Sequence, residues 1–83
     1  MKIEDALALI EITEADYEIT NRISGGLKIL QKYGFDDSHC QYEHDVIYAV
    51  GFDIVEEMSR GDVRKLAKLG WFCDAENECW CHY

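Results

Sequence analysis

The stretch GWFCDAENECWCHY, residues 70–83, brings three cysteines, two tryptophans and one histidine close together in the sequence. Its central residues 75–77 separate two runs rich in aromatic and small apolar residues, which favour strands. Asn77 tolerates the left-handed conformation that the last position of a three-residue loop requires. The stretch therefore predicts a β-hairpin in which Cys73 faces Cys79 and Phe72 faces Trp80.

Both faces of this predicted hairpin are apolar, because side chains alternate between the two faces along a strand. One face would carry Trp71, Cys73, Cys79, Cys81 and Tyr83. The other would carry Phe72, Trp80 and His82. Nothing in so short a chain obviously covers this second face, and exposed aromatic side chains dominate many interfaces. Phe72 and Trp80 are therefore predicted to bind a partner protein or to form a homodimer contact.

The cysteines leave a second interpretation open. A small zinc-stabilised structural or regulatory domain could use Cys73, Cys79 and Cys81, but structural zinc sites usually combine Cys-x2–4-Cys knuckles with a second pair of ligands. Cys81 and His82 are adjacent, so on a strand they would point to opposite faces. Thiols are normally reduced in the cytosol, where free cysteines behave as compact hydrophobic residues. The favoured prediction is reduced, buried cysteines with no metal or other cofactor.

The segment just before the hairpin, residues 59–70, carries signals for a helix. Ser59 with Asp62 three residues later forms an acidic version of the capping box, and Gly70 is a typical stop. Its apolar side consists of Val63, Leu66, Ala67 and Leu69. Its opposite, solvated face consists of Arg60, Arg64, Lys65 and Lys68. These charges form a basic island in an acidic chain.

Further upstream, HCQYEHDVIYAVG, residues 39–51, predicts a first β-hairpin from its β-branched and aromatic residues. With His44 and Asp45 as the turn, Tyr42 lies on the same face as Ile47 and Ala49, and Cys40 shares that face. Neither turn residue is the glycine that a tight turn prefers, so the register is open by one residue.

The N-terminal part predicts two helices. Ile3, Leu7 and Ile10 form an apolar stripe over residues 3–12. A second stripe runs from about Thr13, whose N-cap pattern includes Asp16, to Tyr33, with Gly34 as the C-cap. This second stripe contains Ala15, Ile19, Ile23, Leu27, Ile29, Leu30 and Tyr33. It also contains Gly26, which would allow another element to approach closely.

These elements predict one small α+β domain spanning residues 1–83. N-terminal helices are followed by a β-hairpin, a capped helix and a C-terminal β-hairpin. The four strands are expected to form one antiparallel sheet packed on the helices. The N-terminus lacks the basic start of a secretory signal, and the longest apolar runs are too short to span a membrane. We therefore expect a soluble, cytoplasmic protein.

The charges are unevenly distributed. The net charge is −9, which disfavours direct binding to nucleic acid because the phosphate backbone would be repelled. Residues 34–58 contain seven acids and no lysine or arginine: Asp36, Asp37, Glu43, Asp45, Asp53, Glu56 and Glu57. These seven residues are predicted to form an acidic surface that binds a basic partner, although an acidic run is often only a solvated face.

No catalytic pattern is recognisable. A Cys-His-Asp arrangement could be drawn from Cys40, His39 or His44, and Asp45, but neighbours in sequence seldom reach the required geometry. The glycines of SGGLK lie within a helical pattern and not between a strand and a helix, so they do not form a phosphate-binding loop. The chain is therefore predicted not to be an enzyme.

The second half of the chain, HDVIYAVGFDIVEEMSRGDVRKLAKLGWFCDAENECW, resembles small acidic proteins encoded by phages and mobile elements. The residues that carry this resemblance are His44, Asp45, Gly70, Trp71, Asp74 and Trp80. In size and charge the chain is also similar to anti-CRISPR proteins. The phage and mobile-element group implies no particular activity, and the residues that carry that resemblance look structural. The similarity to anti-CRISPR proteins, together with the acidic surface, implies a phage- or mobile-element-encoded inhibitor that blocks a basic, nucleic-acid-binding site on a host protein such as a defence nuclease.

Overall fold

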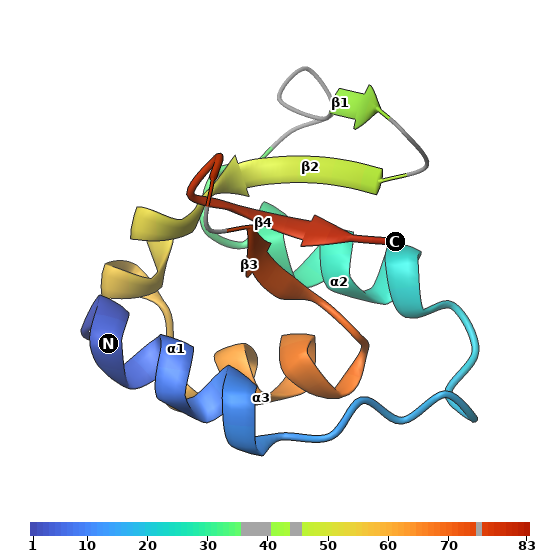
Figure 1. The fold of residues 1–83 in the computed structure, drawn as a ribbon, viewed down its shortest axis with the longest axis horizontal. Coiled ribbons are helices and arrows are strands. Elements are labelled where there is room, and N and C mark those ends of the chain that lie inside the picture. Colours follow the sequence, from blue (N-terminus) through green and yellow to red (C-terminus); the bar gives the residue numbers. More distant parts are fainter. Residues whose placement is uncertain (36–40, 44–45, 75) are drawn as a thin grey trace.

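The computed structural model describes residues 1–35, 41–43, 46–74 and 76–83, and the side chains of residues 41–43 lie outside the description. Figure 1 shows the elements in chain order: α1 (Ile3–Ile12), α2 (Arg22–Gln31), β1 (Gln41–Glu43), β2 (Val46–Gly51), the 3-10 helix η2 (Phe52–Glu57), α3 (Arg60–Lys68), β3 (Phe72–Asp74) and β4 (Cys79–His82). The predicted α+β class is confirmed. In the described part of the chain, every helix is too short or too polar to cross a bilayer.

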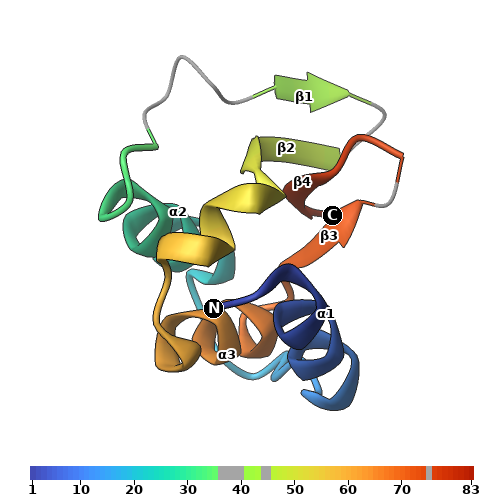
Figure 2. The same ribbon diagram turned by 90° about the vertical axis from the view of Figure 1, so that its left-hand side faces the viewer.

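The sheet has the strand order β1-β2-β4-β3, and all neighbouring strands are antiparallel. Strands β2, β4 and β3 form its three-stranded body, and the short β1 extends it along the outer edge of β2. The last strand of the chain is therefore central, and all four of its residues are buried. Figure 2 shows α2 and η2 on one side of the strands, with α1 and α3 together at the end of the molecule away from β1.

The register of the first hairpin agrees with the prediction. Tyr42 pairs with Ile47, and Glu43 pairs with Val46. This pairing leaves residues 44–45 as the connection between the strands. Both residues, and Cys40, lie outside the described part of the chain.

The predicted register of the second hairpin is wrong by one residue. Asp74 pairs with Cys79, so the connection is residues 75–78, and Glu78 takes the left-handed conformation (φ 50°) instead of Asn77. The Asp74 carboxylate accepts hydrogen bonds from the Asn77 side-chain amide (2.7 Å) and the Glu76 backbone N–H (2.9 Å), which keep the pKa of Asp74 below its usual range. The side chain of Asn77 is thus bonded within the loop, Glu78 takes the left-handed position, and β4 begins at Cys79.

A shift of one residue in the pairing reverses the two faces of one strand relative to its partner. Trp80 now pairs with Cys73, whereas Phe72 pairs with Cys81. Trp80 is 0% exposed and packs on Phe52 with ring centroids 4.9 Å apart, and His82 is 9% exposed. The prediction that Trp80 and His82 lie on an exposed face is therefore wrong. Phe72 is half-buried and packs on Tyr83.

The helix predicted over residues 3–12 is confirmed as α1, but the helix predicted from Thr13 to Tyr33 begins only at Arg22. Asn21 has φ 57° and ψ 37°, a left-handed conformation that a right-handed helix cannot continue through. Ile19 and Ile23, which belong to the predicted apolar stripe, are 37% and 38% exposed.

The segment that precedes α2 is irregular and not helical because it makes other hydrogen bonds. The backbone N–H of Asp16 donates to the carbonyl of Lys68 (2.7 Å), which is at the end of α3. The Asp16 carboxylate accepts from the backbone N–H of Glu18 (3.1 Å), and the Thr13 hydroxyl donates back to the carbonyl of Leu9 (2.6 Å). Such local bonds compete with the helical ladder. The apparent N-cap pattern at Thr13 therefore marks the end of α1.

Gly26 allows the close approach that the sequence predicts. A Cβ atom there would lie 1.9 Å from Nε1 of Trp71, whereas one at Gly25 would make only an ordinary contact. The indole N–H of Trp71 donates to the carbonyl of Arg22 (3.1 Å) and is thereby satisfied. Trp71, which is 1% exposed, thus fixes α2 against the C-terminal hairpin.

Helices α2 and α3 end in the same way. Gly34 and Gly70 both have positive φ (96° and 90°), and the following residues, Phe35 and Trp71, donate backward to carbonyls of the preceding helix. This is the Schellman arrangement, in which glycine avoids the steric cost of a Cβ atom. Both Phe35 and Trp71 are buried, so each cap also adds an aromatic residue to the core.

The predicted start of α3 at Ser59 is also confirmed. The Ser59 hydroxyl accepts from the backbone N–H of Asp62 (3.1 Å). The Tyr33 hydroxyl accepts from the backbone N–H of Ser59 (3.4 Å) and donates to the Asp62 carboxylate. Lys32 forms an ion pair with the same carboxylate (2.9 Å), and the Tyr33 and Lys32 bonds together hold the pKa of Asp62 below its ordinary value. The end of α2 therefore helps to cap α3.

Candidate partner-binding groove

The predicted acidic surface is described in part. Asp53, Glu56 and Glu57 are exposed on η2. Asp36, Asp37 and Asp45 lie outside the described residues, as does the side chain of Glu43. The 3-10 helix alternates these acids with Phe52, Ile54 and Val55, which are buried. The acids are thereby held on the outer side of a segment that is anchored in the core.

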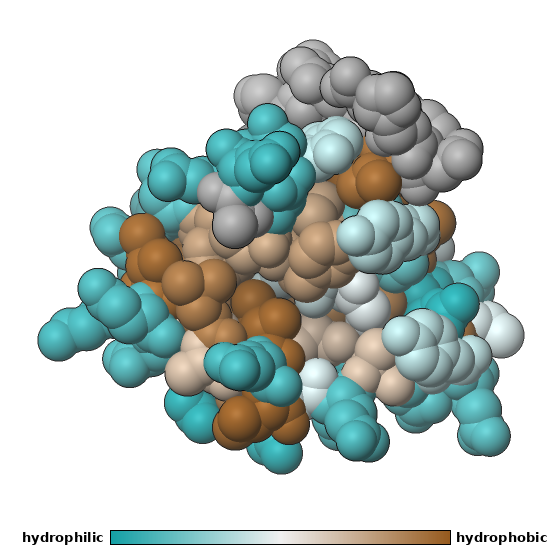
Figure 3. All heavy atoms as spheres, viewed as in Figure 1, coloured by the Kyte–Doolittle hydropathy of each residue, from teal (hydrophilic) through white to brown (hydrophobic). Residues whose placement is uncertain are grey.

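A hollow of about 570 Å³ lies beside η2, between α1 and the loop that joins β3 to β4. Ile3 and Leu7 line it from α1, Phe52 from η2 and Cys73 from β3. Polar groups complete its lining: Asp53, Asn77 and Glu78. Figure 3 shows hydrophobic residues gathered over α1 and toward the strands, with hydrophilic residues around them.

Helix α1 exposes apolar residues to this hollow because it turns a different stripe toward the core. Ala6 (0% exposed) and Leu9 (4%) are its buried residues, and Ile3 is only partly buried. Leu7 is 44% exposed. An exposed leucine is common in proteins, but here it lies next to Ile3, one helical turn away, in the wall of a concave surface.

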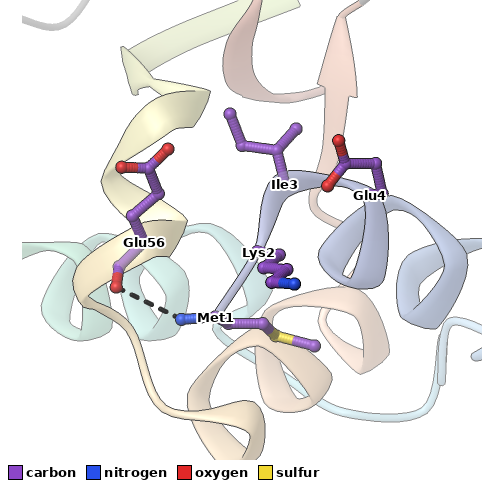
Figure 4. Close-up of a pocket in the computed structure, with 5 residues that line it drawn as sticks. All are labelled: Met1, Lys2, Ile3, Glu4 and Glu56. Atoms are coloured by element: carbon purple, nitrogen blue, oxygen red, sulfur yellow. Dashed lines mark hydrogen bonds between the residues drawn. The ribbon is translucent and has the colours of Figure 1, made fainter.

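A second hollow, of about 390 Å³, adjoins the first at Ile3. Figure 4 shows Ile3 between Glu4, on α1, and Glu56, on η2. The Met1 amino group donates to the carbonyls of Glu56 (3.2 Å) and Met58 (3.5 Å), so the start of α1 is joined to η2. Together the two hollows form the α1–η2 groove, whose apolar floor is Ile3, Leu7, Phe52 and Cys73 and whose acidic rim is Glu4, Asp53, Glu56 and Glu78.

The acids of the rim are all exposed. Within the described residues, the single ion pair joins Lys32 to Asp62, so no rim carboxylate is neutralised by a salt bridge. Lys2 is the only lysine or arginine that lines either hollow. The groove therefore combines an apolar floor with an excess of negative charge.

The floor is fixed by the core behind it. The backbone N–H of Phe52 donates to the carbonyl of Glu78 (2.8 Å), which ties η2 to the loop between β3 and β4. The Phe52 ring packs on buried Trp80. Trp80 is thus buried and does not lie on the exposed face that the sequence predicts, and it packs against a residue that lines the hollow.

The three described cysteines do not form a shared ligand set. Cys79 and Cys81 lie two residues apart on β4, whereas Cys73 pairs with Trp80 and therefore points to the other face. Burial raises the pKa of all three thiols, and that of Cys81 to about 12. These thiols are protonated at neutral pH, which disfavours both metal binding and nucleophilic attack.

The candidate catalytic residues are not covered by the structure. His39, Cys40, His44 and Asp45 lie outside the described part of the chain. Within the residues that are described, no group of three or more His, Cys, Asp or Glu side chains is arranged to hold a metal ion.

Sequence reasoning located η2 as acidic but missed Leu7 and Glu78 as groove residues. The apolar pattern of α1 was visible in the sequence, but which of its apolar residues face the core depends on where α3 and η2 pack. Glu78 joins the rim because it occupies the left-handed position in the loop. Comparison with protein-family models, curated proteins and solved structures gives no match to this chain.

Proposed function

We propose that this protein is a protein-binding module, and that the α1–η2 groove is the site that engages its partner. The observation that carries this proposal is the union of an apolar floor with unpaired carboxylates on both sides of it. Interfaces gain affinity from apolar side chains buried in pockets and gain specificity and association rate from complementary charge.

The lining defines the chemistry of the partner. Leu7, Ile3 and Phe52 favour an aliphatic or aromatic side chain, and the carboxylates of Asp53 and Glu78 favour lysine or arginine beside it. The volume of the larger hollow, about 570 Å³, is in the range of sites that take a few side chains or a small molecule. The partner is therefore a basic protein surface with a protruding apolar residue.

The proposal extends to inhibition. Surfaces rich in lysine and arginine commonly bind the phosphates of nucleic acids, and carboxylates that occupy such a surface exclude phosphates from it. An acidic module with its own apolar anchor would thus block a nucleic-acid-binding site on a host protein. A defence nuclease blocked by a phage- or mobile-element-encoded protein is the proposed setting.

The binding proposal is tested with an NMR titration of the full chain with a short amphipathic peptide of lysine and leucine. We expect chemical-shift changes at Ile3, Leu7 and Phe52, and an affinity that falls steeply with added salt, because exposed charges are screened over roughly 8 to 10 Å at physiological ionic strength. A peptide with serine in place of leucine is the matched control and should bind more weakly. Shift changes outside the groove, or equal binding of the two peptides, would contradict the proposal.

The inhibition proposal needs the partner itself. The immobilised chain and a Leu7→Ser/Asp53→Asn variant are exposed to the same host extract, and proteins retained only by the parent are identified. We expect such a protein to bind nucleic acid and to release it when the parent chain is added. A retained partner that keeps its nucleic acid would contradict inhibition while leaving the binding site intact.

A further inference from the structure

The outward face of α3 carries a second, oppositely charged surface. Arg64, Lys65 and Lys68 line a hollow of about 450 Å³ together with Ile19, Gly61 and Leu69. All three cations are exposed. Within the described residues none of them has an ion-pair partner, although the chain has an excess of acids. Positive charge is therefore concentrated and unneutralised at this place.

Gly61 gives the hollow its shape. It lies one turn before Arg64 and Lys65 on the same stripe of α3, and a Cβ atom there would meet nothing within 4 Å. Packing therefore does not require glycine, and glycine is unfavourable within a helix. Its absent side chain leaves room for another molecule to reach the helix backbone between the cations.

The floor of the hollow is aliphatic. Leu69 belongs to the core, and Ile19 is held beside α3 because Asp16, three residues earlier, donates its backbone N–H to the carbonyl of Lys68. Ile19 also lines a neighbouring hollow with Tyr17, Ile23 and Tyr83, all of them exposed. Apolar surface thus continues from the basic stripe toward the start of α2.

We propose that this basic hollow docks an acidic segment of a partner protein, in which carboxylates flank an aliphatic or aromatic side chain. The carboxylates would pair with Lys65, Lys68 and Arg64, and the apolar side chain would lie on Ile19 over Gly61. Because three cations line the hollow, charge complementarity favours an acidic partner. The apolar floor favours protein over nucleic acid, since phosphates gain nothing from Ile19 whereas an apolar side chain is buried there.

A second copy of this chain fits less well. Among the described residues, the carboxylates that surround an apolar floor are those of the α1–η2 groove, which is itself concave, and two concave surfaces leave their floors unfilled. The site instead needs a convex segment, so the chain would hold an acidic partner on α3 and a basic partner on α1 and η2. The proposal concerns a different face from the α1–η2 groove and can fail independently of it.

The test is an NMR titration with a peptide of glutamate and leucine, compared with a peptide of glutamate and serine and with a short DNA duplex. The glutamate–leucine peptide should shift the resonances of Ile19, Gly61 and Lys65 and should bind most tightly of the three probes. Equal binding of the serine peptide, preferential binding of the duplex, or chain dimerisation through this face would each overturn the proposal.

Two variants locate the contact. Lys65→Glu should lower the affinity for the glutamate–leucine peptide about fivefold. Lys28→Glu, an equal change of charge on the exposed side of α2, should lower this affinity less than twofold. Gly61→Ala should raise the midpoint of thermal unfolding by about 2 to 4 °C and yet lower the affinity for the peptide. A Gly61→Ala variant that binds as well as the parent, or equal effects of the two lysine variants, would refute the assignment.

Discussion

The C-terminal hairpin and the α1–η2 groove lie side by side but use their apolar residues differently. The hairpin holds the most conspicuous residues of the sequence, Trp71 and Trp80, and both are buried. The groove is lined by Ile3 and Leu7, ordinary residues of a short helix, and Leu7 is 44% exposed. In a domain of this size the largest aromatic residues are needed for the core. In the proposed function, binding therefore falls to smaller apolar residues at the margin of the core.

The largest effect that this comparison predicts is that of Trp80→Ala. The side chain is fully buried against Phe52, so its removal should lower the free energy of unfolding by about 3–5 kcal/mol. Denaturant unfolding at neutral pH measures this loss. A loss below about 1 kcal/mol would mean that Trp80 is not part of the core.

Gly26→Ala should be next in size. The added Cβ atom would overlap the Trp71 ring, and such overpacking costs about 1–3 kcal/mol. Gly25→Ala is the matched control, since its Cβ atom would lie 3.5 Å from Leu69. That variant should gain up to about 1 kcal/mol from helix propensity. Equal effects of the two alanines on the unfolding midpoint would contradict the packing of Trp71 on α2.

Tyr33→Phe tests how α2 caps α3. Loss of the hydroxyl should lower stability by about 1–2 kcal/mol at pH 7, because it removes a donor to the ionised Asp62 and an acceptor for Ser59. The folded pKa of Asp62 is below its ordinary value of 3.8, so its charged form stabilises the fold above that pH. This contribution is lost as the pH falls through the folded pKa.

The deficit of Tyr33→Phe should therefore shrink in acid. Unfolding measured from pH 7 down to below pH 3.8 checks this, with Tyr17→Phe as the control because Tyr17 is 79% exposed. A deficit that is independent of pH would show that the hydroxyl acts without the Asp62 carboxylate.

The smallest effect on stability should come from the groove. Leu7→Ser removes a half-exposed side chain and should cost less than about 1 kcal/mol. The same change should lower the affinity for the lysine–leucine peptide severalfold. Leu9, two residues later on the buried side of α1, is 4% exposed. Leu9→Ser should therefore cause a large loss of stability. If Leu7→Ser unfolds the protein, Leu7 is core and the floor of the groove is misassigned.

The sequence was most informative where structure depends on neighbouring residues. The start of α3 at Ser59 and its end at Gly70 follow from capping rules, and both are found as predicted. The helical start at Thr13 failed because a bond between Asp16 and Lys68, distant in sequence, competes with it. The hairpin register failed because Asn77 bonds to Asp74 and leaves the left-handed position to Glu78.

The candidate site, like the fold, was predictable only where it depends on residues close together in the sequence. The acids of η2 could be found from composition, and Asp53 and Glu56 do line the groove. Trp80 was placed on the surface because one residue of register exchanges the two faces of a strand. Leu7 and Glu78 become neighbours only when α1 packs beside the loop between β3 and β4, and no local pattern reports that contact.

The central claim is that the carboxylates of the groove, and not the general acidity of the chain, attract the partner. It is tested most directly by comparing Asp53→Asn/Glu78→Gln with Glu11→Gln/Glu14→Gln, two variants with the same change of net charge. Glu11 and Glu14 are exposed and line neither hollow of the groove. The measurement is the affinity of each variant for the lysine–leucine peptide as a function of salt. We predict a loss of about five- to tenfold and a shallower salt dependence for the groove variant, with less than a twofold change for its control. Equal losses in the two variants would contradict the claim.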